Sequence, residues 1–337
     1  MFGELILFAG KALVILFVIG GLMMLIALLV ARSQQSQELE VEPLHTKLKD
    51  IGFFLRGFRL SKEDQKAEAK KKKDELKKAK KEKEKKHVVF VLRFDGDIKA
   101  SQVASLREEV TAVLQASQPG DEVLCVVDSP GGVVNGYGHA ASQLLRLRAA
   151  GLKLTVAVDE VAASGGYLMA CVANQIIAAP FAIIGSIGVV AQVPNFNKVL
   201  KKHNVDYHEY TAGEFKRTVS LFGEITPKGE EKFLRQLEET HLLFKDFVQR
   251  FRPQLDVAQV ATGEYWYGEN AINLKLIDRI ATSDDFVLEK VKENARVLEI
   301  HYQQPKSFQE KIAGVLGKAG EKALLRIWTS LEKQKFF

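Results

Sequence analysis

The segment 161–167, VAASGGY, places a serine directly before two glycines, an arrangement that suits a nucleophile. Lys153 to Val158 is apolar and β-branched and predicts a buried strand that leads to Ser164, and Gly165 to Cys171 predicts the start of a helix. A serine at that junction lies where unpaired backbone N–H groups and the positive end of the helix point outward. Acyl transfer needs such donors, because they stabilise the oxyanion that forms when a nucleophile attacks. Ser164 is therefore a candidate nucleophile, although a plain serine N-cap gives the same local pattern.

A serine nucleophile needs a base, and the sequence offers no clear one. None of the seven histidines has an evident catalytic position, and Ala162 replaces the first glycine of the G-x-S-x-G motif. A lysine serves as base when burial disfavours its charged form. The candidates after Ser164 are Lys198, Lys201, Lys202 and Lys216. Spacing alone does not choose among them.

The amino-acid composition limits which classes of protein this chain can belong to. The 337 residues are 47% hydrophobic, enough for a substantial core. The formal charge of +6 equals the excess of 13 lysines over 7 acidic residues in Lys62 to Lys86. A single lysine run without aromatic residues or arginine argues against a nucleic-acid-binding fold. Cys125 and Cys171 lie in apolar contexts typical of buried thiols, and no Cys or His spacing predicts a metal site.

Residues 12–31 contain no charge and are long enough for a helix that spans a bilayer. The run is longer than the core of a signal peptide and lacks a small-x-small cleavage pattern, so we expect an uncleaved anchor after a short flank, 1–11. The flanking charges are nearly balanced and do not fix its orientation. Residues 32–86 read as a linker with a lysine-rich spacer; its apolar stretch Ile51 to Leu60 suits the membrane interface or the domain surface equally.

From His87 the pattern alternates between strands and helices, which predicts a mostly parallel sheet. The expected strands are 88–94, 122–127 and 153–158, and the expected helices are 101–115 and 135–149. Functional sites in such sheets gather at the carboxyl ends of the strands. Two glycine-rich turns, 129–132 and 164–166, follow strands there.

The helices and strands predicted for the second half of the domain are less regular. Ile176 to Val193 is long and apolar, but Pro180 and two glycines interrupt it, so we expect a buried strand, turn and strand. We expect a helix at 196–203, a strand at 205–210, and a long amphipathic helix at 226–251 with Thr226 as N-cap. Residues 254–281 supply smaller helices and a strand that close the domain. Residues 305–337 predict an interfacial helix or an oligomer contact.

Several motifs together resemble the signal peptide peptidase A family of serine/lysine peptidases, most closely its SohB branch. They are, in order, DSPGG at 128–132, AASGGY at 162–167, AP at 179–180, GSIGV at 185–189 and GEFK at 213–216. The resemblance covers roughly residues 88–286. It implies a catalytic peptidase domain at 87–287 with the ClpP and crotonase-like spiral of β-β-α units, an α/β fold, followed by a strand and amphipathic tail at 288–337.

The resemblance also implies roles for individual residues. Ser164 would be the nucleophile, Lys216 the general base, and Ser186 the group that orients the lysine. The backbone N–H groups of Gly131 or Gly132, together with Gly165, would form the oxyanion hole. Neither a cofactor nor a metal is implied. Departures are modest: Leu168 follows Tyr167 where relatives often have another aromatic residue.

Relatives assemble into membrane-facing rings or domes, so the resemblance implies a homo-oligomer in which Lys216 can serve a neighbouring subunit's Ser164. It also implies peptide substrates with apolar segments, and a single-pass anchor in a bacterial inner membrane with a periplasmic catalytic domain. Two other functions remain open on the sequence: a crotonase-like acyl-CoA enzyme, and a catalytically idle membrane scaffold.

Overall fold

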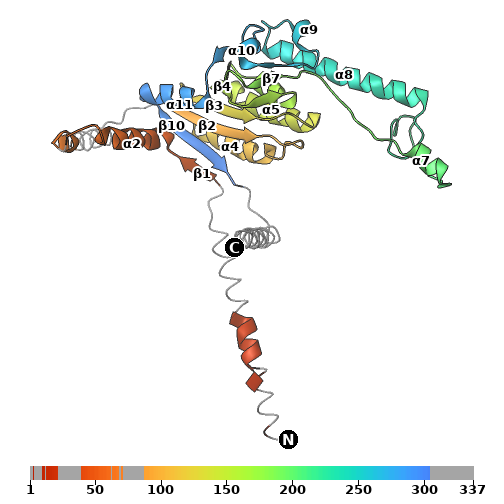
Figure 1. Ribbon diagram of the computed structural model, residues 1–337, viewed down its shortest axis with the longest axis horizontal. Coiled ribbons are helices and arrows are strands. Elements are labelled where there is room, and N and C mark those ends of the chain that lie inside the picture. The colour runs from red at the N-terminus through yellow and green to blue at the C-terminus, as the bar shows by residue number, and fades with distance from the viewer. Residues whose placement is uncertain are drawn as a thin grey trace, which may run out of the picture. The chain divides into compact units, whose positions relative to one another are not determined.

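A computed structural model describes residues 3, 10–11, 13–21, 39–61, 63–67, 70 and 87–303 (Figure 1). Residues 13–21 are helical, while the rest of the predicted span 12–31, most of the lysine-rich spacer and the predicted tail lie outside the described residues. In the described part of the chain, no helix has the length and apolar character that a bilayer crossing needs. The membrane anchor therefore stays a prediction.

The chain divides into two compact units, of which Val41–Tyr302 contains both sheets, except for the first two residues of β1, and every candidate site residue. The other unit consists of residues 1–40 and 303–337. In chain order the elements are β1 (Leu39–Glu42), α2 (Leu44–Gly57), β2 (Val88–Asp95), α4 (Val103–Ala116), β3 (Glu122–Asp128), α5 (Val134–Ala149), β4 (Lys153–Val158), β5 (Val161–Ala163), α6 (Gly165–Ala170), β6 (Gln175–Ala178), β7 (Ile183–Gly185), α7 (Asn197–Lys202), α8 (Pro227–Phe251), α9 (Val257–Val260), β8 (Tyr265–Tyr267), α10 (Gly268–Ala271), β9 (Arg279–Ile280), α11 (Ser283–Lys292) and β10 (Arg296–Tyr302).

The larger sheet has seven strands in the order β1-β10-β2-β3-β4-β6-β9. The pairs from β10 to β9 are all parallel. Parallel neighbours need crossover connections, and α4 and α5 supply those between β2, β3 and β4. The α/β class predicted from the alternating pattern is confirmed.

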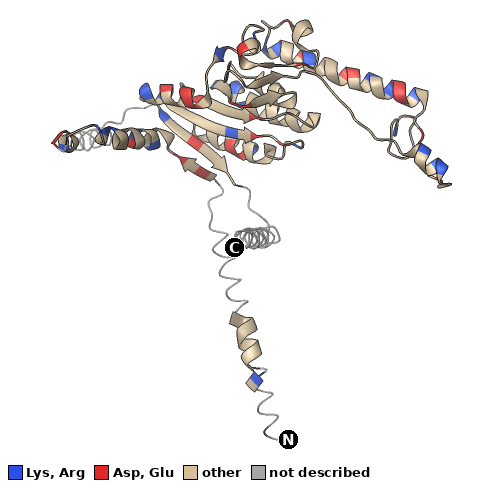
Figure 2. Ribbon diagram, viewed as in Figure 1, with Lys and Arg blue, Asp and Glu red and all other residues tan. Residues whose placement is uncertain are grey.

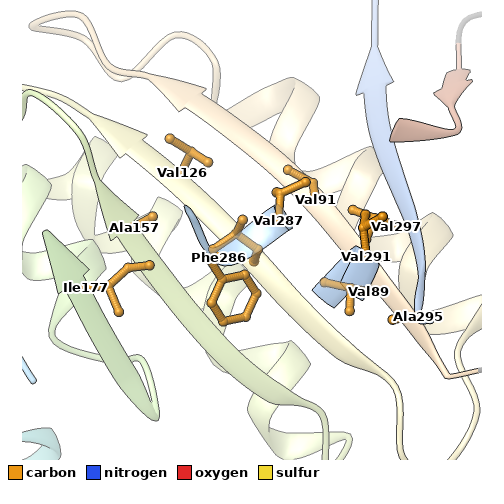
Figure 3. Close-up of a cluster of buried hydrophobic side chains, with 11 residues drawn as sticks. Val89, Val91, Val126, Ala157, Ile177, Phe286, Val287, Val291, Ala295 and Val297 are labelled. Carbon is orange, nitrogen blue, oxygen red and sulfur yellow. The ribbon is translucent and has the colours of Figure 1, made fainter. Parts of the chain in front are cut away.

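Both faces of the larger sheet are buried along its central strands β2, β3 and β4, as their near-continuous apolar character requires. Along β2, Val89 and Val91 belong to a cluster under α11, which also contains Phe286 (Figure 3). The alternate residues Phe90, Leu92 and Phe94 are buried too. Helices α4 and α5 pack against each other, α4 against β2, and α5 against β4.

The smaller sheet, with the order β5-β7-β8, was not predicted as a separate layer. The predicted strand 153–158 is confirmed as β4, but β4 does not lead directly into Ser164. The chain turns at Asp159 and Glu160 and forms β5, which pairs in parallel with β7. The strand, turn and strand predicted from 176–193 are present as β6 and β7, which lie in different sheets.

The predicted boundaries of the domain do not coincide with those of the sheet. Residue 287 falls inside α11, and β10 beyond it pairs with β2. Within the predicted linker, α2 packs Leu44 and Leu48 against the cluster under α11. Sequence periodicity could not reveal either contact, because each joins segments far apart in the chain.

Residues 189–226 form an extension between β7 and α8, and no residue from 188 to 228 is buried. Helix α8 is confirmed, with the Thr226 side chain accepting a hydrogen bond from the Gly229 N–H. Figure 1 shows α7 near the start of α8, away from both sheets, and Figure 2 shows charged residues along α8. The strand predicted at 205–210 is wrong, because these exposed residues have no strand beside them to pair with.

Candidate active site

Ser164 lies in a sharp turn between β5 and α6. Its φ of 52° and ψ of −116° are conformations that residues with a side chain rarely adopt. The Ser164 N–H donates to the Gly185 carbonyl at 2.7 Å, and the Leu168 N–H donates to the Ser164 carbonyl at 2.9 Å. Its hydroxyl is half-buried and has no hydrogen-bond partner among the described residues. The turn has the form of a strand-to-helix nucleophile elbow, although Ala162 replaces the usual first glycine.

Backbone pairing with two other segments of the chain holds this elbow in place from both sides. Ala163 pairs with Gly185 of β7. On the other side the Ser129 N–H donates to the Val161 carbonyl at 2.8 Å, and the Ala163 N–H donates to the Ser129 carbonyl at 3.0 Å. The two glycine-rich turns predicted at strand ends are thus brought together by β5.

The glycines of the two turns approach each other too closely for side chains. A Cβ built on Gly131 would lie 2.8 Å from the Ser164 Cβ and 2.7 Å from the Gly165 nitrogen. A Cβ on Gly132 would lie 2.1 Å from the Ile98 carbonyl oxygen. Gly131 also has a φ of 89°, which favours glycine.

The backbone N–H groups near Ser164 differ in whether they have a hydrogen-bond partner. The Gly131 N–H donates to the Ser129 Oγ at 3.1 Å. The N–H groups of Gly132 and Gly165 have no partner among residues the structure describes. Of the two alternatives predicted from the resemblance, Gly131 or Gly132, it is Gly132 whose N–H is free among the described residues.

Ser186 directly follows the residue that receives the Ser164 N–H. It has a φ of 50°, and its own N–H donates to the Glu264 carbonyl at 2.6 Å. Its half-buried hydroxyl has no partner within the described chain. The structure thus brings Ser164 and Ser186 to neighbouring strand ends.

Lys216 lies in the extension, not in the two-sheet body that holds Ser164. Its backbone N–H donates to the Gly213 carbonyl at 3.1 Å, while its amine has no partner in the described part of the chain. Residues 189–225, as far as they are described, form hydrogen bonds and ion pairs with one another or with the start of α8, for example Glu214 with Lys228. No described contact joins Lys216 to Ser164 within one chain.

Two residues beneath the elbow were missed by the sequence reasoning. Ser129 and Tyr137 are fully buried, and their hydroxyls are hydrogen-bonded to each other. Ser129 lies within the DSPGG motif, which was the available signal, but Tyr137 lies on α5 and carries no motif of its own. Next to Ser129, burial and the carboxylates of Glu160 and Asp95 raise the pKa of Asp128.

This arrangement can support nucleophilic chemistry. It combines an unpartnered hydroxyl on a strained turn with two unpartnered N–H groups beside it, the elements that acyl transfer requires. Over the described residues, no cluster of three or more His, Cys, Asp or Glu side chains could hold a metal ion.

Comparison with known proteins identifies related chains. Residues 1–144 match the family model described as "Peptidase family S49 N-terminal", and residues 146–297 match "Peptidase family S49". The chain is 53% identical over 302 residues to "Probable protease SohB" of Haemophilus influenzae, covering 86% of this chain and 84% of that one. The protein of the same name from Buchnera aphidicola subsp. Schlechtendalia chinensis is 57% identical over 203 residues, covering 60% and 67%.

Among solved structures, a mutant of a membrane-bound stomatin-specific protease aligns with a TM-score of 0.39 and 16% identity. The alignment covers 61% of this chain and 84% of that chain. A likeness of this size carries no argument about the fold or the site. The resemblance to SohB proteins predicted from the motifs is confirmed by the sequence comparisons.

Proposed function

Because the chain belongs to peptidase family S49, we propose that it is a membrane-anchored serine endopeptidase that works through a Ser/Lys dyad and an acyl-enzyme intermediate. One observation carries the assignment of the nucleophile: the free hydroxyl of Ser164 stands on a strained turn beside the unpaired N–H groups of Gly132 and Gly165.

In the proposed mechanism the neutral amine of Lys216 takes the proton of Ser164 as Oγ attacks the scissile carbonyl carbon. The N–H groups of Gly132 and Gly165 hold the oxyanion that forms. When this intermediate collapses, the carbon–nitrogen bond breaks and the Lys216 ammonium gives its proton to the leaving amine. Water, deprotonated by the same amine, then attacks the acyl-enzyme and releases the second peptide and Ser164.

We propose that Lys216 acts on Ser164 of a neighbouring subunit, with the Ser186 hydroxyl of that neighbour orienting the amine. The extension supports this, because its described bonds lead only to itself and to α8, and its lysine amine is free. A single chain then holds an incomplete site, so activity requires a homo-oligomer such as a ring or dome. A neutral lysine at neutral pH further requires that the interface between subunits desolvate its amine.

The proposed fold is the ClpP and crotonase-like spiral. Its support is the repeated order of elements: β4, β5 and α6 are followed by β6 and β7, and the first strand of each pair lies in the larger sheet while the second lies in the smaller one. Parallel pairing of β4 with β6 and of β5 with β7 fits successive turns of one spiral.

We propose peptide segments rich in apolar residues as substrates. Val133, directly after Gly132, donates its N–H to the Ile98 carbonyl at 2.8 Å. Both side chains are exposed, Ile98 by 72% and Val133 by 47%. An apolar side chain of a substrate held at the oxyanion hole would contact them and leave water, which favours binding.

Membrane attachment is proposed from two features. The first is the uncharged run 12–31. The second is α2, whose first half packs on the core, while Phe54 near its end and Phe58 directly after it are 64% and 76% exposed. Four basic residues and one acidic residue lie within 44–61, which complements an anionic lipid surface. We place the anchor in a bacterial inner membrane with the domain on the periplasmic side; a reporter fused after Phe337 tests that side.

The mechanism is tested with the full chain, purified in detergent or reconstituted in vesicles. Ser164→Ala and Lys216→Ala are assayed on an apolar peptide substrate, with Lys202→Ala as the matched control from the same extension. We expect each of the first two to lower kcat at least about a thousandfold, and the control to keep wild-type activity. Retained activity in Ser164→Ala and Lys216→Ala would remove the mechanism.

Labelling by a serine-reactive fluorophosphonate probe distinguishes the proposed peptidase from the two other functions that the sequence left open. A crotonase-like acyl-CoA enzyme would bind CoA and need no reactive Ser164, and an idle scaffold would take up no label. We expect labelling of the wild type and none of Ser164→Ala.

A further inference from the structure

Beneath the elbow, four groups form one chain of hydrogen bonds. The Gly131 N–H donates to the Ser129 Oγ at 3.1 Å, the Ser129 hydroxyl is bonded to the Tyr137 hydroxyl, and the Tyr137 hydroxyl donates to the Asp97 carbonyl at 2.8 Å. The Ser129 hydroxyl can donate either to Tyr137 or to the Gly96 carbonyl at 3.3 Å, so either hydroxyl can donate in the bond between Ser129 and Tyr137. An amide N–H can only donate, so in both arrangements the Ser129 Oγ accepts from Gly131.

This chain determines which way the Gly131 peptide faces. Its N–H is held toward the buried Ser129, which has no exposed surface. The following N–H, that of Gly132, is left without a partner among the described residues. If Ser129 lost its oxygen, the buried Gly131 N–H would lack an acceptor, at a cost that favours rotation of the peptide toward solvent.

Tyr137 also contacts the other unpaired donor. A Cβ built on Gly165 would lie 2.4 Å from Cγ of the Tyr137 ring, so the Gly165 backbone rests directly on that ring. Tyr137 is itself fully buried on α5. Tyr137 thus supports both donors. Its ring lies against Gly165, and its hydroxyl bonds to Ser129, which in turn holds the Gly131–Gly132 turn.

We propose that Ser129 and Tyr137 are positioning residues that set the oxyanion hole: their hydrogen-bond chain withdraws the Gly131 N–H and leaves the N–H groups of Gly132 and Gly165 as its two donors. This inference rests on the proposed peptidase function. Its physical basis is that oxyanion donors are effective when they are held in place before the reaction begins. Neither side chain touches the substrate.

The test compares the full-length variants Ser129→Ala and Tyr137→Phe with the wild type. Ser129→Ala removes the acceptor of the Gly131 N–H. Tyr137→Phe keeps the ring under Gly165, and the Ser129 hydroxyl can turn to the Gly96 carbonyl at 3.3 Å, so Ser129 still accepts from Gly131. Ser283→Ala is the matched control, because this serine is 3% exposed and donates its hydroxyl to Asp159 at 2.5 Å, outside the elbow.

Losing a whole oxyanion donor lowers kcat about 10²- to 10³-fold, and we expect misplacing one to lower it about tenfold to a hundredfold in Ser129→Ala. The loss should be severalfold in Tyr137→Phe and absent in Ser283→Ala. KM should stay within about threefold in all three variants, because the ground-state carbonyl depends less on the hole. The inhibition constant of a peptide aldehyde, whose adduct carries the oxyanion, should rise in parallel with the loss of kcat.

A second measurement does not depend on activity. Hydrogen exchange, followed by mass spectrometry on the peptides around residue 131, should show a Gly131 amide that is protected in the wild type and exchanges faster in Ser129→Ala. Unchanged exchange would overturn the proposal whether or not the chain cleaves peptides. Faster exchange with a wild-type kcat and aldehyde affinity would also overturn it, while a wild type inactive in every assay would refute the peptidase function itself.

Discussion

Ser164 and Ser186 hold matching places at the ends of two parallel strands, β5 and β7, and both have positive φ angles, 52° and 50°. The Ser164 N–H is bonded to the carbonyl of Gly185, the residue just before Ser186, at 2.7 Å. Backbone pairing thus places the two serines together, and neither hydroxyl has a partner in the described residues. An amine delivered between them would find both hydroxyls free.

Removing the Ser186 hydroxyl should weaken the orientation of that amine. We expect Ser186→Ala and Ser186→Gly both to lower kcat/KM about tenfold to a hundredfold and to change the pH at which activity rises. The glycine variant adopts a φ of 50° without strain, so equal losses in both variants would assign the effect to the hydroxyl. The pH–activity profile is the measurement, and wild-type profiles in both variants would contradict the role of Ser186.

Two inactive variants should regain activity when their subunits are mixed in one oligomer, if the dyad forms between subunits. Subunits carrying Ser164→Ala retain Lys216, and subunits carrying Lys216→Ala retain Ser164. Dissociation, mixing in equal amounts and reassembly of the two should return about a quarter of the wild-type activity when neighbours are random. A mixture that stays as inactive as its components would show that one chain supplies both residues.

A side chain on Gly131 should disturb the elbow. Gly131→Ala places a methyl group 2.8 Å from the Ser164 Cβ at a φ of 89°. We expect a loss of about 1–3 kcal/mol in the free energy of unfolding and at least a tenfold loss of kcat. Gly138→Ala is the control, because a Cβ there meets nothing within 4 Å. Denaturant unfolding and steady-state kinetics measure both, and equal behaviour of the two variants would contradict the expectation.

Glu109 should make stability depend on pH. It is 2% exposed, and burial raises the pKa of its carboxyl above the ordinary 4.5, opposed by the Tyr302 N–H that it accepts. Because the pKa is raised in the folded state, protonation of this carboxyl stabilises the fold. That contribution to the free energy of unfolding is complete below about pH 4.5 and is lost as the pH rises through the folded-state pKa. Glu109→Gln does not titrate, so its melting temperature relative to the wild type should increase between pH 4 and pH 8. A constant difference would contradict this.

The exposed end of α2 should contact anionic lipid. A Phe58→Cys variant of the full chain, labelled with an environment-sensitive fluorophore, should shift to shorter wavelength in vesicles containing phosphatidylglycerol but less so in phosphatidylcholine alone. Burial raises the pKa of the native thiols of Cys125 and Cys171, which protects them from labelling. Leu242→Cys, at a 53% exposed position of α8, is the control. Equal spectra at positions 58 and 242 would contradict lipid contact by α2.

How much could be predicted from the sequence depended on the range of the interactions involved. Strands β2, β3 and β4 were placed within a residue, because each is six to eight residues long and consists mostly of apolar, largely β-branched residues. Helix α8 was placed as well, because Thr226 and Pro227 mark its start. β5, with three residues, is too short to leave a periodic signal. Residues 205–210 have the pattern of a strand and form none, because pairing requires a partner that the pattern does not contain.

The α/β class, the family and the candidate chemistry at Ser164 could be inferred from the residues alone, since those depend on local patterns and motifs. Three features could be seen only in the folded chain: Gly131 turns its N–H inward to Ser129, Tyr137 supports Gly165, and Lys216 lies in an extension whose described contacts do not reach the elbow. The reason is physical: a hydrogen bond or a close packing contact depends on positions in space, and residues distant in the chain acquire those positions only when strands from both sheets pair.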